Sequence, residues 1–284
     1  MPPRLVSLAI LIYWSIAAFC LFTWDLLPEL SLGYPPDFRA IAAAGESGRP
    51  ARWSIQVIDD PKSPEIRRAI GEAVTKSRRL PDGWFELSSQ VDFDSAGLLQ
   101  GTPLAAQGSF PLRIHSIYRV DPSGNLRNFD MRVSVAETAE RLFTVAGRLK
   151  GQTMEVEAKG PISMLNQKLS FPYEPRSVVH DALGPLDRLP GLSVGQRWET
   201  RAVNPFSGQV ERVRVEVARR TLIHWGGETV SAFEVVQNAG PIAARTWVRN
   251  DGVILRQEVP FPIVRLVLDR LTDDAPATFE GGGP

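Results

Sequence analysis

Between residues 53 and 271 the chain alternates apolar and polar residues, and turn residues interrupt this alternation at short intervals. Successive side chains of a β-strand point to opposite faces, so the alternation predicts strands with one buried face. In residues 126–135, for example, Phe129, Met131 and Val133 alternate with Asp130 and Arg132. The strands predicted in this way cover residues 53–58, 72–80, 84–93, 114–120, 126–135, 142–149, 154–158, 167–173, 209–220, 229–237, 243–249, 253–259 and 263–270.

Turn motifs indicate how these strands connect. Pro81-Asp82-Gly83 and Asn250-Asp251-Gly252 each stand between two alternating runs, which is typical of a β-hairpin. No long helix interleaves the strands, so a parallel sheet is disfavoured and antiparallel neighbours are favoured. The best helical candidate in this region is residues 176–189, although Gly184 and Pro185 interrupt it.

The two faces of the predicted sheet differ in polarity. The charged face can lie in water, whereas the apolar face must be covered. The cover could be the far edge of the same sheet curling over, the 176–189 segment, a partner or a lipid. We therefore expect a mainly β protein: a large curled antiparallel sheet, forming an open half-barrel with a short helical plug.

The N-terminal region contains an apolar run, Leu5–Trp24, of 20 residues without a charge. A helix of this length is about 30 Å long, which matches the hydrocarbon core of a bilayer. Arg4 precedes the run and Asp25 follows it, so the positive-inside rule places the N-terminus in the cytoplasm. The expectation is one N-terminal transmembrane helix in the cytoplasmic membrane, with the bulk of the chain outside.

Three other interpretations of this run are weaker. A cleaved signal peptide needs small residues near its end, where Phe22 and Trp24 stand instead. A lipoprotein would be anchored at Cys20, but Phe19 precedes it where a small residue is expected. A buried globular helix would normally show a polar face, and none is present.

The domain organisation follows from these patterns. Residues 1–24 are the predicted anchor, and residues 25–52, which are rich in Pro, Gly and Ala, are a predicted tether. Residues 53–271 form the antiparallel β domain. Residues 272–284 are predicted to be a disordered tail.

Composition excludes several classes of function. The 32 Lys and Arg residues balance 32 Asp and Glu residues, which argues against nucleic acid as a partner because such a binder needs a concentrated basic face. Cys20 is the single cysteine, so neither an intramolecular disulfide nor a cysteine-based zinc site can form.

Two segments carry a resemblance to a known family. One is Pro190–Trp198, which reads GL-x-V-G before a strand, and the other is Thr246–Arg256, which reads W-x-x-x-D-G-x-x-x-R across a late hairpin. They resemble an uncharacterised family of bacterial envelope proteins that is itself similar to the lipoprotein-carrier half-barrel. The resemblance covers residues 190–270 and implies an open sheet around a helical plug with an apolar cavity between them. It implies no catalytic residue.

A few side chains in the sequence could in principle bind a metal ion or take part in catalysis. His115, His180 and His224 show no helical i, i+4 spacing, so we expect structural or surface histidines. Asp92, Asp94 and Gly97 match three positions of a calcium loop, but Ala96 and Pro103 stand at two ligand positions, so a strand end is expected. Glu155 and Glu157 share a strand face and are expected to meet cross-strand arginines. The five tryptophans outside the anchor are expected to pack in the core.

The sequence thus predicts no catalytic, cofactor-binding or metal-binding residue and no cofactor, and it leaves ligand-binding residues unknown. The leading functional hypothesis is a non-enzymatic, membrane-anchored envelope protein whose concave face holds a lipid or another apolar ligand. One alternative is an envelope interaction module with a self-filled core, whose sheet edge pairs with a protein partner. The other is an envelope hydrolase with an unrecognised site.

Overall fold

The computed structural model describes residues 4–21, 36, 50–58, 66–95, 110–136, 138, 140–161, 166–173, 187–203, 210–239, 242–260 and 265–272. They contain one helix, α1 (Arg4–Leu21), and 14 strands. The strands are β1 (Ala51–Ile58), β2 (Arg67–Arg79), β3 (Phe85–Asp94), β4 (Pro111–Val120), β5 (Leu126–Val135), β6 (Arg141–Lys150), β7 (Thr153–Lys159), β8 (Gln167–Pro172), β9 (Arg197–Val203), β10 (Val210–Trp225), β11 (Glu228–Ala239), β12 (Ile242–Arg249), β13 (Ile254–Pro260) and β14 (Arg265–Arg270).

All the strands belong to one antiparallel sheet. Its order is β8-β7-β6-β5-β4-β3-β2-β1-β14-β13-β12-β11-β10-β9, so nearly every strand pairs with its neighbour in the chain. The exception is β1, which pairs with β14 and joins the two halves of the meander; Trp53 lies opposite Arg270 and Ile55 opposite Leu268. The edge strands β8 and β9 do not pair with each other, so the sheet is not closed.

Turn chemistry explains the short connections. Gly83 has φ of 83° and Gly252 has φ of 84°, a left-handed conformation that glycine adopts without steric cost. In the β2–β3 turn the amide of Gly83 donates to the carbonyl of Leu80, and in the β12–β13 turn the amide of Gly252 donates to the carbonyl of Arg249. Both hairpins were predicted, and both are confirmed.

The prediction of a mainly β protein with one large antiparallel sheet is confirmed, but the edge strand β9 was not predicted and some strand bounds differ. β1 begins at Ala51, so the last two residues of the predicted tether, Ala51 and Arg52, pair with β2 instead. β2 begins at Arg67 rather than at residue 72, and β10 continues to Trp225 rather than ending at residue 220. In each case interstrand pairing extends the strand beyond the run that alternates regularly in sequence.

The predicted helical plug is not observed at its described end. Residues 174–186 lie outside the described residues, and 187–189 are not helical. Arg188 forms a bridge with Val253, and the amide of Leu189 donates to the carbonyl of Gly252 at 2.7 Å. Backbone groups of residues 188 and 189 thus pair with the β12–β13 turn, and they could not make these hydrogen bonds if the segment were helical.

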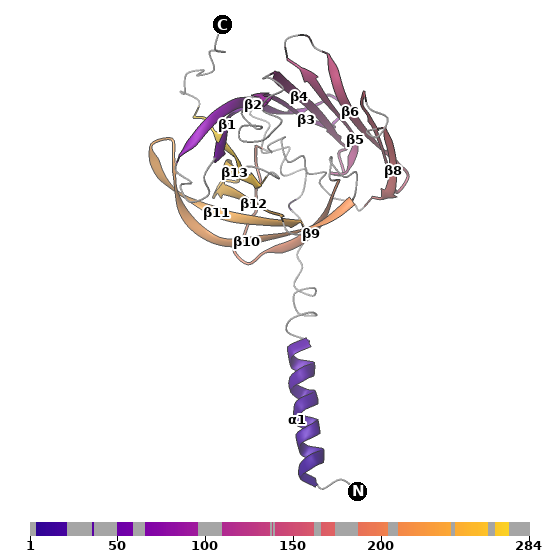
Figure 1. Ribbon diagram of the computed structural model, residues 1–284, viewed down its shortest axis with the longest axis vertical. Helices are drawn as coiled ribbons and strands as arrows, with labels where there is room; N and C mark the ends of the chain where they lie inside the picture. The colour runs from indigo at the N-terminus through magenta and orange to yellow at the C-terminus, as the bar shows by residue number, and fades with distance from the viewer. Residues whose placement is uncertain are drawn as a thin grey trace.

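The sheet covers its own apolar face by curling. Figure 1 shows β1–β4 on one side and β9–β13 on the other side of a shared interior. The largest apolar cluster combines Trp53 of β1, Val91 of β3, Val215 of β10 and Leu268 of β14. Leu189 and Leu192, from the segment before β9, pack into the same cluster. Of the covers considered from the sequence, the far edge of the sheet is therefore the main one among the described residues.

The N-terminal helix α1 is 18 residues long and stands apart from the strands in Figure 1. Among the described residues, no helix combines the length and the apolar character that crossing a membrane requires. The predicted anchor extended to Trp24, whereas α1 ends at Leu21, and residues 22–24 lie outside the described part. The predicted tether up to residue 49, apart from Pro36, and the predicted tail from residue 273 also lie outside it.

Candidate functional site

We call the face of the sheet that carries Trp53, Ile55 and Val57 the inner face, and the opposite face the outer face. Register places most of the apolar alternating residues of the other strands on the inner face; Phe85, Leu87, Val91 and Phe93 of β3 are all buried there. A smaller apolar cluster that includes Ala232 and Trp247 lies on the outer face. Ion pairs between neighbouring strands lie on the outer face. The chemistry available inside the curled sheet is therefore mainly apolar.

The inner face is not equally covered along the sheet. On β1, Trp53, Ile55 and Val57 are at most 2% exposed. Towards the edge strand β8, apolar side chains of the inner face are only partly buried. We call five of them the apolar strip: Met131, Phe143, Ala158, Leu169 and Phe171. The strip crosses β5, β6, β7 and β8 and is apolar surface that the described residues do not fully cover.

A row of hydroxyl side chains interrupts the inner face beside the strip. Thr75 of β2 lies opposite Ser89 of β3, and Ser89 lies opposite Ser116 of β4. All three are buried, at 5%, 6% and 1% exposure. We call them the hydroxyl row. The next residue in the same register is Met131 of the apolar strip, which lies opposite Ser116, so polar and apolar parts of the inner face adjoin.

A carboxyl group is buried next to this row. Asp187 is 7% exposed, and its carboxylate accepts a hydrogen bond from Ser77, the inner-face residue that follows Thr75 on β2. Its backbone carbonyl accepts from Arg270 Nη1 at 3.0 Å. Burial raises the pKa of the Asp187 carboxyl above its ordinary value, and the guanidinium groups of Arg270 and Arg188 offset only part of this effect.

This raised pKa predicts a specific pH dependence of stability. Asp187 ionises at lower pH in the unfolded chain than in the fold, so its contribution to the free energy of unfolding falls as pH rises above about 4. Asp187→Asn removes that fall. The free energy of unfolding of the variant minus that of the unmodified chain should therefore be larger at pH 7 than at pH 4. Urea unfolding of both proteins at the two pH values measures this difference.

Asp251→Asn is a control of opposite sign. The hydrogen bond from Arg249 holds the pKa of Asp251 below its ordinary value, so ionised Asp251 contributes stability at neutral pH and loses it on acidification. This variant should be less stable than the unmodified chain at pH 7, by a margin that shrinks towards pH 3. If the free-energy difference for Asp187→Asn did not change with pH, the argument from burial would be contradicted.

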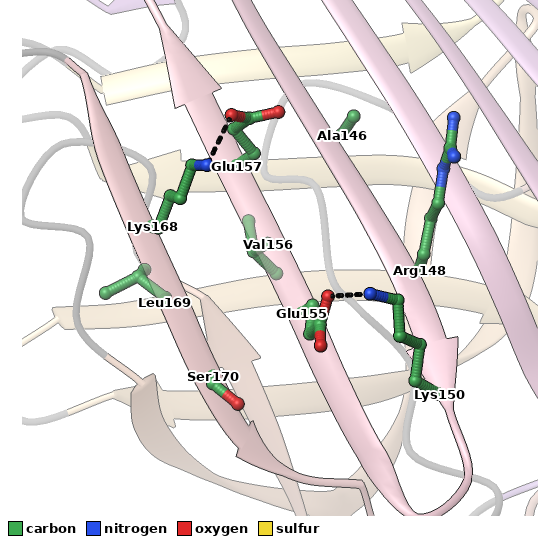
Figure 2. Close-up of a pocket in the computed structure, with 9 residues that line it drawn as sticks. All are labelled: Ala146, Arg148, Lys150, Glu155, Val156, Glu157, Lys168, Leu169 and Ser170. Atoms are coloured by element: carbon green, nitrogen blue, oxygen red, sulfur yellow. Dashed lines mark ion pairs between the residues drawn. The ribbon is translucent and has the colours of Figure 1, made fainter.

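An open groove of about 420 Å³ lies on the outer face of β6, β7 and β8. Figure 2 shows that charged side chains line it: Lys150 pairs with Glu155 at 2.7 Å and Lys168 with Glu157 at 3.4 Å. Hydrogen bonds from Lys159 and Lys168 hold the pKa of Glu157 below its ordinary value, which keeps it ionised and unsuited to donating a proton. The expected ion pairing of Glu155 and Glu157 is confirmed, but their partners are lysines rather than arginines. This groove is a solvated charged surface.

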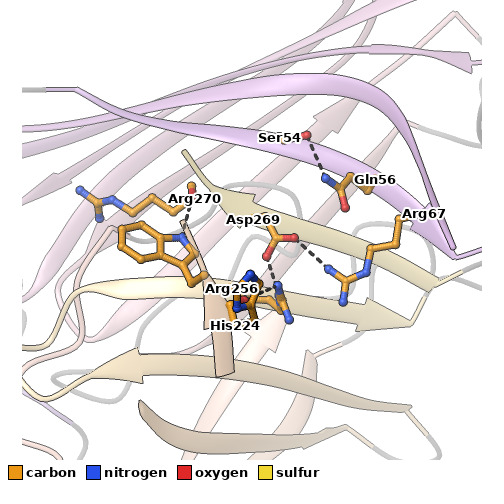
Figure 3. A network of polar contacts seen from close by, with 8 residues as sticks. Ser54, Gln56, Arg67, His224, Arg256, Asp269 and Arg270 are labelled. Carbon is orange, nitrogen blue, oxygen red and sulfur yellow. Dashed lines mark hydrogen bonds and ion pairs between the residues drawn. The ribbon is translucent and has the colours of Figure 1, made fainter. Parts of the chain in front are cut away.

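A second polar network lies at the seam between the two halves of the sheet (Figure 3). Asp269 of β14 accepts from Arg67 Nη1 of β2 at 2.8 Å and from Arg256 Nε of β13. These contacts connect strands on both sides of the β1–β14 pair. Both arginines are largely buried, with 20% and 17% of their side-chain surface exposed. The network stabilises the seam and leaves no carboxylate oxygen of Asp269 without a cation.

The structure does not bring the histidines together. His115 lies on β4 between Gln90 and Arg132, His224 lies near the end of β10, and His180 is outside the described residues. The side chain of His224 is exposed, and its carbonyl accepts from Arg256 Nη2 at 3.4 Å. Within the described ranges, no group of three His, Cys, Asp or Glu side chains could hold a metal ion.

The other predicted features have clear positions. Asp92 and Asp94 lie at the end of β3, as expected of a strand end, and Asp92 accepts from Arg113 Nε at 2.6 Å; Gly97 is outside the described residues. Trp53, Trp198 and Trp247 are buried, which confirms core packing for these three. The remaining two, Trp84 and Trp225, are only half-buried.

Neither the hydroxyl row nor the burial of Asp187 was predicted from the residue pattern. Ser89 and Ser116 continue the period-two pattern of β3 and β4 at inner positions, but a small hydroxyl residue is also common on an exposed face. A run of three hydroxyl residues at inner positions of consecutive hairpin strands is the signal that could have located the row, and reading it requires the register. Asp187 lay within the predicted helical segment 176–189, in which no buried polar residue was predicted.

The two segments that carried the family resemblance meet in space. The amide of Leu189 donates to the carbonyl of Gly252, and a side chain at Gly252 would collide with Pro190, with its Cβ 2.8 Å from the Pro190 Cα. Asp251 accepts from the amide of Val253 and pairs with Arg249, which fixes the turn. These contacts give both segments a structural role at one end of the sheet.

Comparisons with known proteins locate the chain only broadly. No family model matches the sequence, and no curated protein matches it. Among solved structures, the chain is similar to the crystal structure of a beta-barrel-like protein of a domain of unknown function (DUF1849) from Brucella abortus. The TM-score is 0.49 at 9% sequence identity, over 78% of this chain and 94% of that chain. The likeness to the lipoprotein-carrier half-barrel stays a prediction.

Proposed function

We propose that this protein is a membrane-attached β domain of the bacterial envelope that holds an apolar ligand, such as a lipid acyl chain, against the apolar strip. The observation that carries the proposal is the partial exposure of Met131, Phe143, Ala158, Leu169 and Phe171 on the inner face towards the edge strand β8. Apolar surface of this kind gains about 25 cal/mol per Å² when it is covered. The strip lies at the β8 edge, where no strand pairing between β8 and β9 closes the sheet.

Membrane attachment through residues 5–24 is part of this proposal. The apolar side chains of α1 that the structure describes are exposed: Tyr13, Trp14 and Phe19 by 68–70%, and Ile12 and Ile16 by more than half. Large apolar side chains without a protein cover are typical of a segment that lies in lipid. With Arg4 on the cytoplasmic side, the β domain would lie outside the cytoplasmic membrane.

Replacing Leu169 with aspartate should weaken ligand binding by about tenfold or more, because it places a charge within the apolar strip. The full chain in mild detergent is titrated with a fluorescent fatty-acid analogue. Ser170→Asp is the matched control, since Ser170 is the next residue on the same edge strand but points to the outer face. The control should bind the analogue as the unmodified chain does.

Native mass spectrometry of the detergent-extracted full chain provides an independent test, with a bound lipid as the expected result. Equal loss of binding in Leu169→Asp and Ser170→Asp would contradict the assignment of the strip. If no lipid were bound and cross-linking in membranes gave a stoichiometric protein partner, the interaction module would replace this proposal.

A further inference from the structure

The hydroxyl row contains a buried polar atom that has no partner among the described residues. Ser89 is 6% exposed, and its Oγ makes no hydrogen bond. A buried hydroxyl without a partner destabilises a fold, and in native structures such groups call for an explanation. Replacement by alanine would remove this cost without leaving a large void, so the described part of the fold gives no reason for a serine at this position.

The neighbours of Ser89 already have partners. On β2, the Thr75 hydroxyl accepts from Trp53 Nε1 at 3.1 Å, and Ser77 donates to the carboxylate of Asp187. The adjacent residue on β3, Ser88, points to the outer face, and its hydroxyl donates to the carbonyl of Lys76. Ser89 therefore differs from these three residues because its hydroxyl has no hydrogen-bond partner among the described residues.

The position of Ser89 connects it to the apolar strip. Ser89, Ser116, Met131, Val145 and Ala158 lie opposite one another on five consecutive strands, β3 to β7. Neighbouring strands are about 4.8 Å apart, so Ser89 lies roughly 10 Å from the strand that carries Met131. A ligand that covers the strip could extend a polar group along this row.

The charges near the row favour an uncharged polar group. The residues of the row and the strip carry no charge, and the arginines and lysines of β3–β8 that form ion pairs do so on the outer face. The buried carboxyl in the neighbourhood, Asp187, would repel an anion once ionised. The cations on this side, Arg270 and Arg188, lie beside Asp187 and act on its carboxylate. A phosphate at the row would have to compete with Asp187 for them, which is costly in an apolar interior.

We propose that Ser89 is the hydrogen-bond donor of a subsite for an uncharged acceptor, such as the ester carbonyl of a neutral acyl lipid, whose chains cover the apolar strip. The inference rests on the proposed function, because it names the chemical class of the ligand that the strip holds. A hydroxyl can donate one hydrogen bond and accept others, so an ester carbonyl satisfies its donor directly. The class excludes lipids whose first polar group is a phosphate.

The test compares probes that share their acyl chains. The full chain in mild detergent is titrated with a diacylglycerol, with the phosphatidylglycerol of the same chains, and with a hydrocarbon of equal chain length, each competing with the fluorescent fatty-acid analogue. The diacylglycerol should bind at least tenfold more tightly than the phosphatidylglycerol. Ser89→Ala should weaken diacylglycerol binding about five- to tenfold and leave hydrocarbon binding unchanged, whereas the matched control Ser88→Ala should change neither.

The stability of the ligand-free variant shows whether a loss of binding is caused by misfolding. Because the Ser89 hydroxyl has no partner among the described residues, Ser89→Ala should leave the urea midpoint of the ligand-free chain unchanged or raise it. A lower midpoint would show that the hydroxyl has a structural partner and would overturn the inference. Equal binding of diacylglycerol to Ser89→Ala and to the unmodified chain would also overturn the Ser89 subsite. If the hydrocarbon still bound in that case, the proposed function of the apolar strip would be retained. If no probe bound, the proposed function itself would fail.

Discussion

Replacing Trp53 with alanine should lower the free energy of unfolding by about 3–5 kcal/mol, the range measured for large aromatic side chains in cores. Trp53 is 0% exposed and belongs to the largest apolar cluster. Its Nε1 donates to Thr75 Oγ1, and the guanidinium of Arg270 lies 5.8 Å from the ring centroid. Since Trp53 pairs with Arg270 across the β1–β14 seam, its removal weakens the contact between the two halves of the sheet.

Two control variants separate the causes of this loss. Trp84 is half-buried at the β2–β3 turn, so Trp84→Ala should cost less than half as much. Trp53→Phe keeps most of the apolar volume and removes the hydrogen bond to Thr75, so its cost should be about 1–3 kcal/mol. Urea unfolding of the full chain in mild detergent measures all three. Equal effects of Trp53→Ala and Trp84→Ala would contradict the assignment of Trp53 to the centre of the core.

Local pattern was sufficient to predict 13 of the 14 described strands, and β9 (Arg197–Val203) was missed. Alternation specifies which residues of a strand share a face, and hairpin turns such as Asn250-Asp251-Gly252 fix the pairing of adjacent strands. Both kinds of information are contained within some twenty residues. Where pairing extended a strand past its regular alternation, as in β10 at Trp225, the prediction ended too early, because the partner strand rather than the local sequence sets the end.

The seam between β1 and β14 could not be predicted in this way. Its partners Ile55 and Leu268 are more than 200 residues apart, and each looks like any other buried strand residue in sequence. Curling of the sheet was one of four covers that the sequence left open for its apolar face. The choice depends on how twist accumulates over 14 strands, which no local motif encodes.

The candidate site was predictable only in its apolar part. Met154, Val156 and Ala158 were assigned to one face from alternation, and the structure confirms this. Ser89 and Asp187 were missed, because a buried polar group is recognised from what surrounds it rather than from its own residue type. For Ser89 the surroundings come from β2 and β4, and for Asp187 they come from β2 and the strands around Arg270.

The inner face of β2 explains how bulky side chains fit at the seam. Its residues there are small: Gly71, Ala73, Thr75 and Ser77. The neighbouring strands fill the space beside them with large side chains, among them Trp53 of β1 and Phe93 of β3. A bulge in the β1–β2 pairing between Ile55 and Gln56 adjoins Gly71. The register of three strands therefore depends on a position without a side chain.

Gly71→Ala should for this reason lower the free energy of unfolding by about 3 kcal/mol, at the upper end of the range for overpacked cores. The added Cβ would overlap the backbone oxygen of Asp92 and lie 2.6 Å from the Phe93 Cβ. Backbone atoms held in a β-ladder cannot move aside without breaking the ladder. At Gly147 an added Cβ would instead overlap the ring of Phe129, which is a side chain and not ladder backbone, so Gly147→Ala should cost less.

A glycine in open space completes the comparison. Gly151, in the β6–β7 turn, has φ of 60° and nothing within 4 Å of an added Cβ, and asparagine tolerates this conformation. Gly151→Asn should therefore change the free energy of unfolding by no more than about 0.5–1 kcal/mol. The expected order of loss in urea unfolding is Gly71→Ala, Gly147→Ala, Gly151→Asn. If Gly71→Ala were as stable as Gly151→Asn, β2 could shift relative to β3, and the hydroxyl row, which depends on that register, would lose its support.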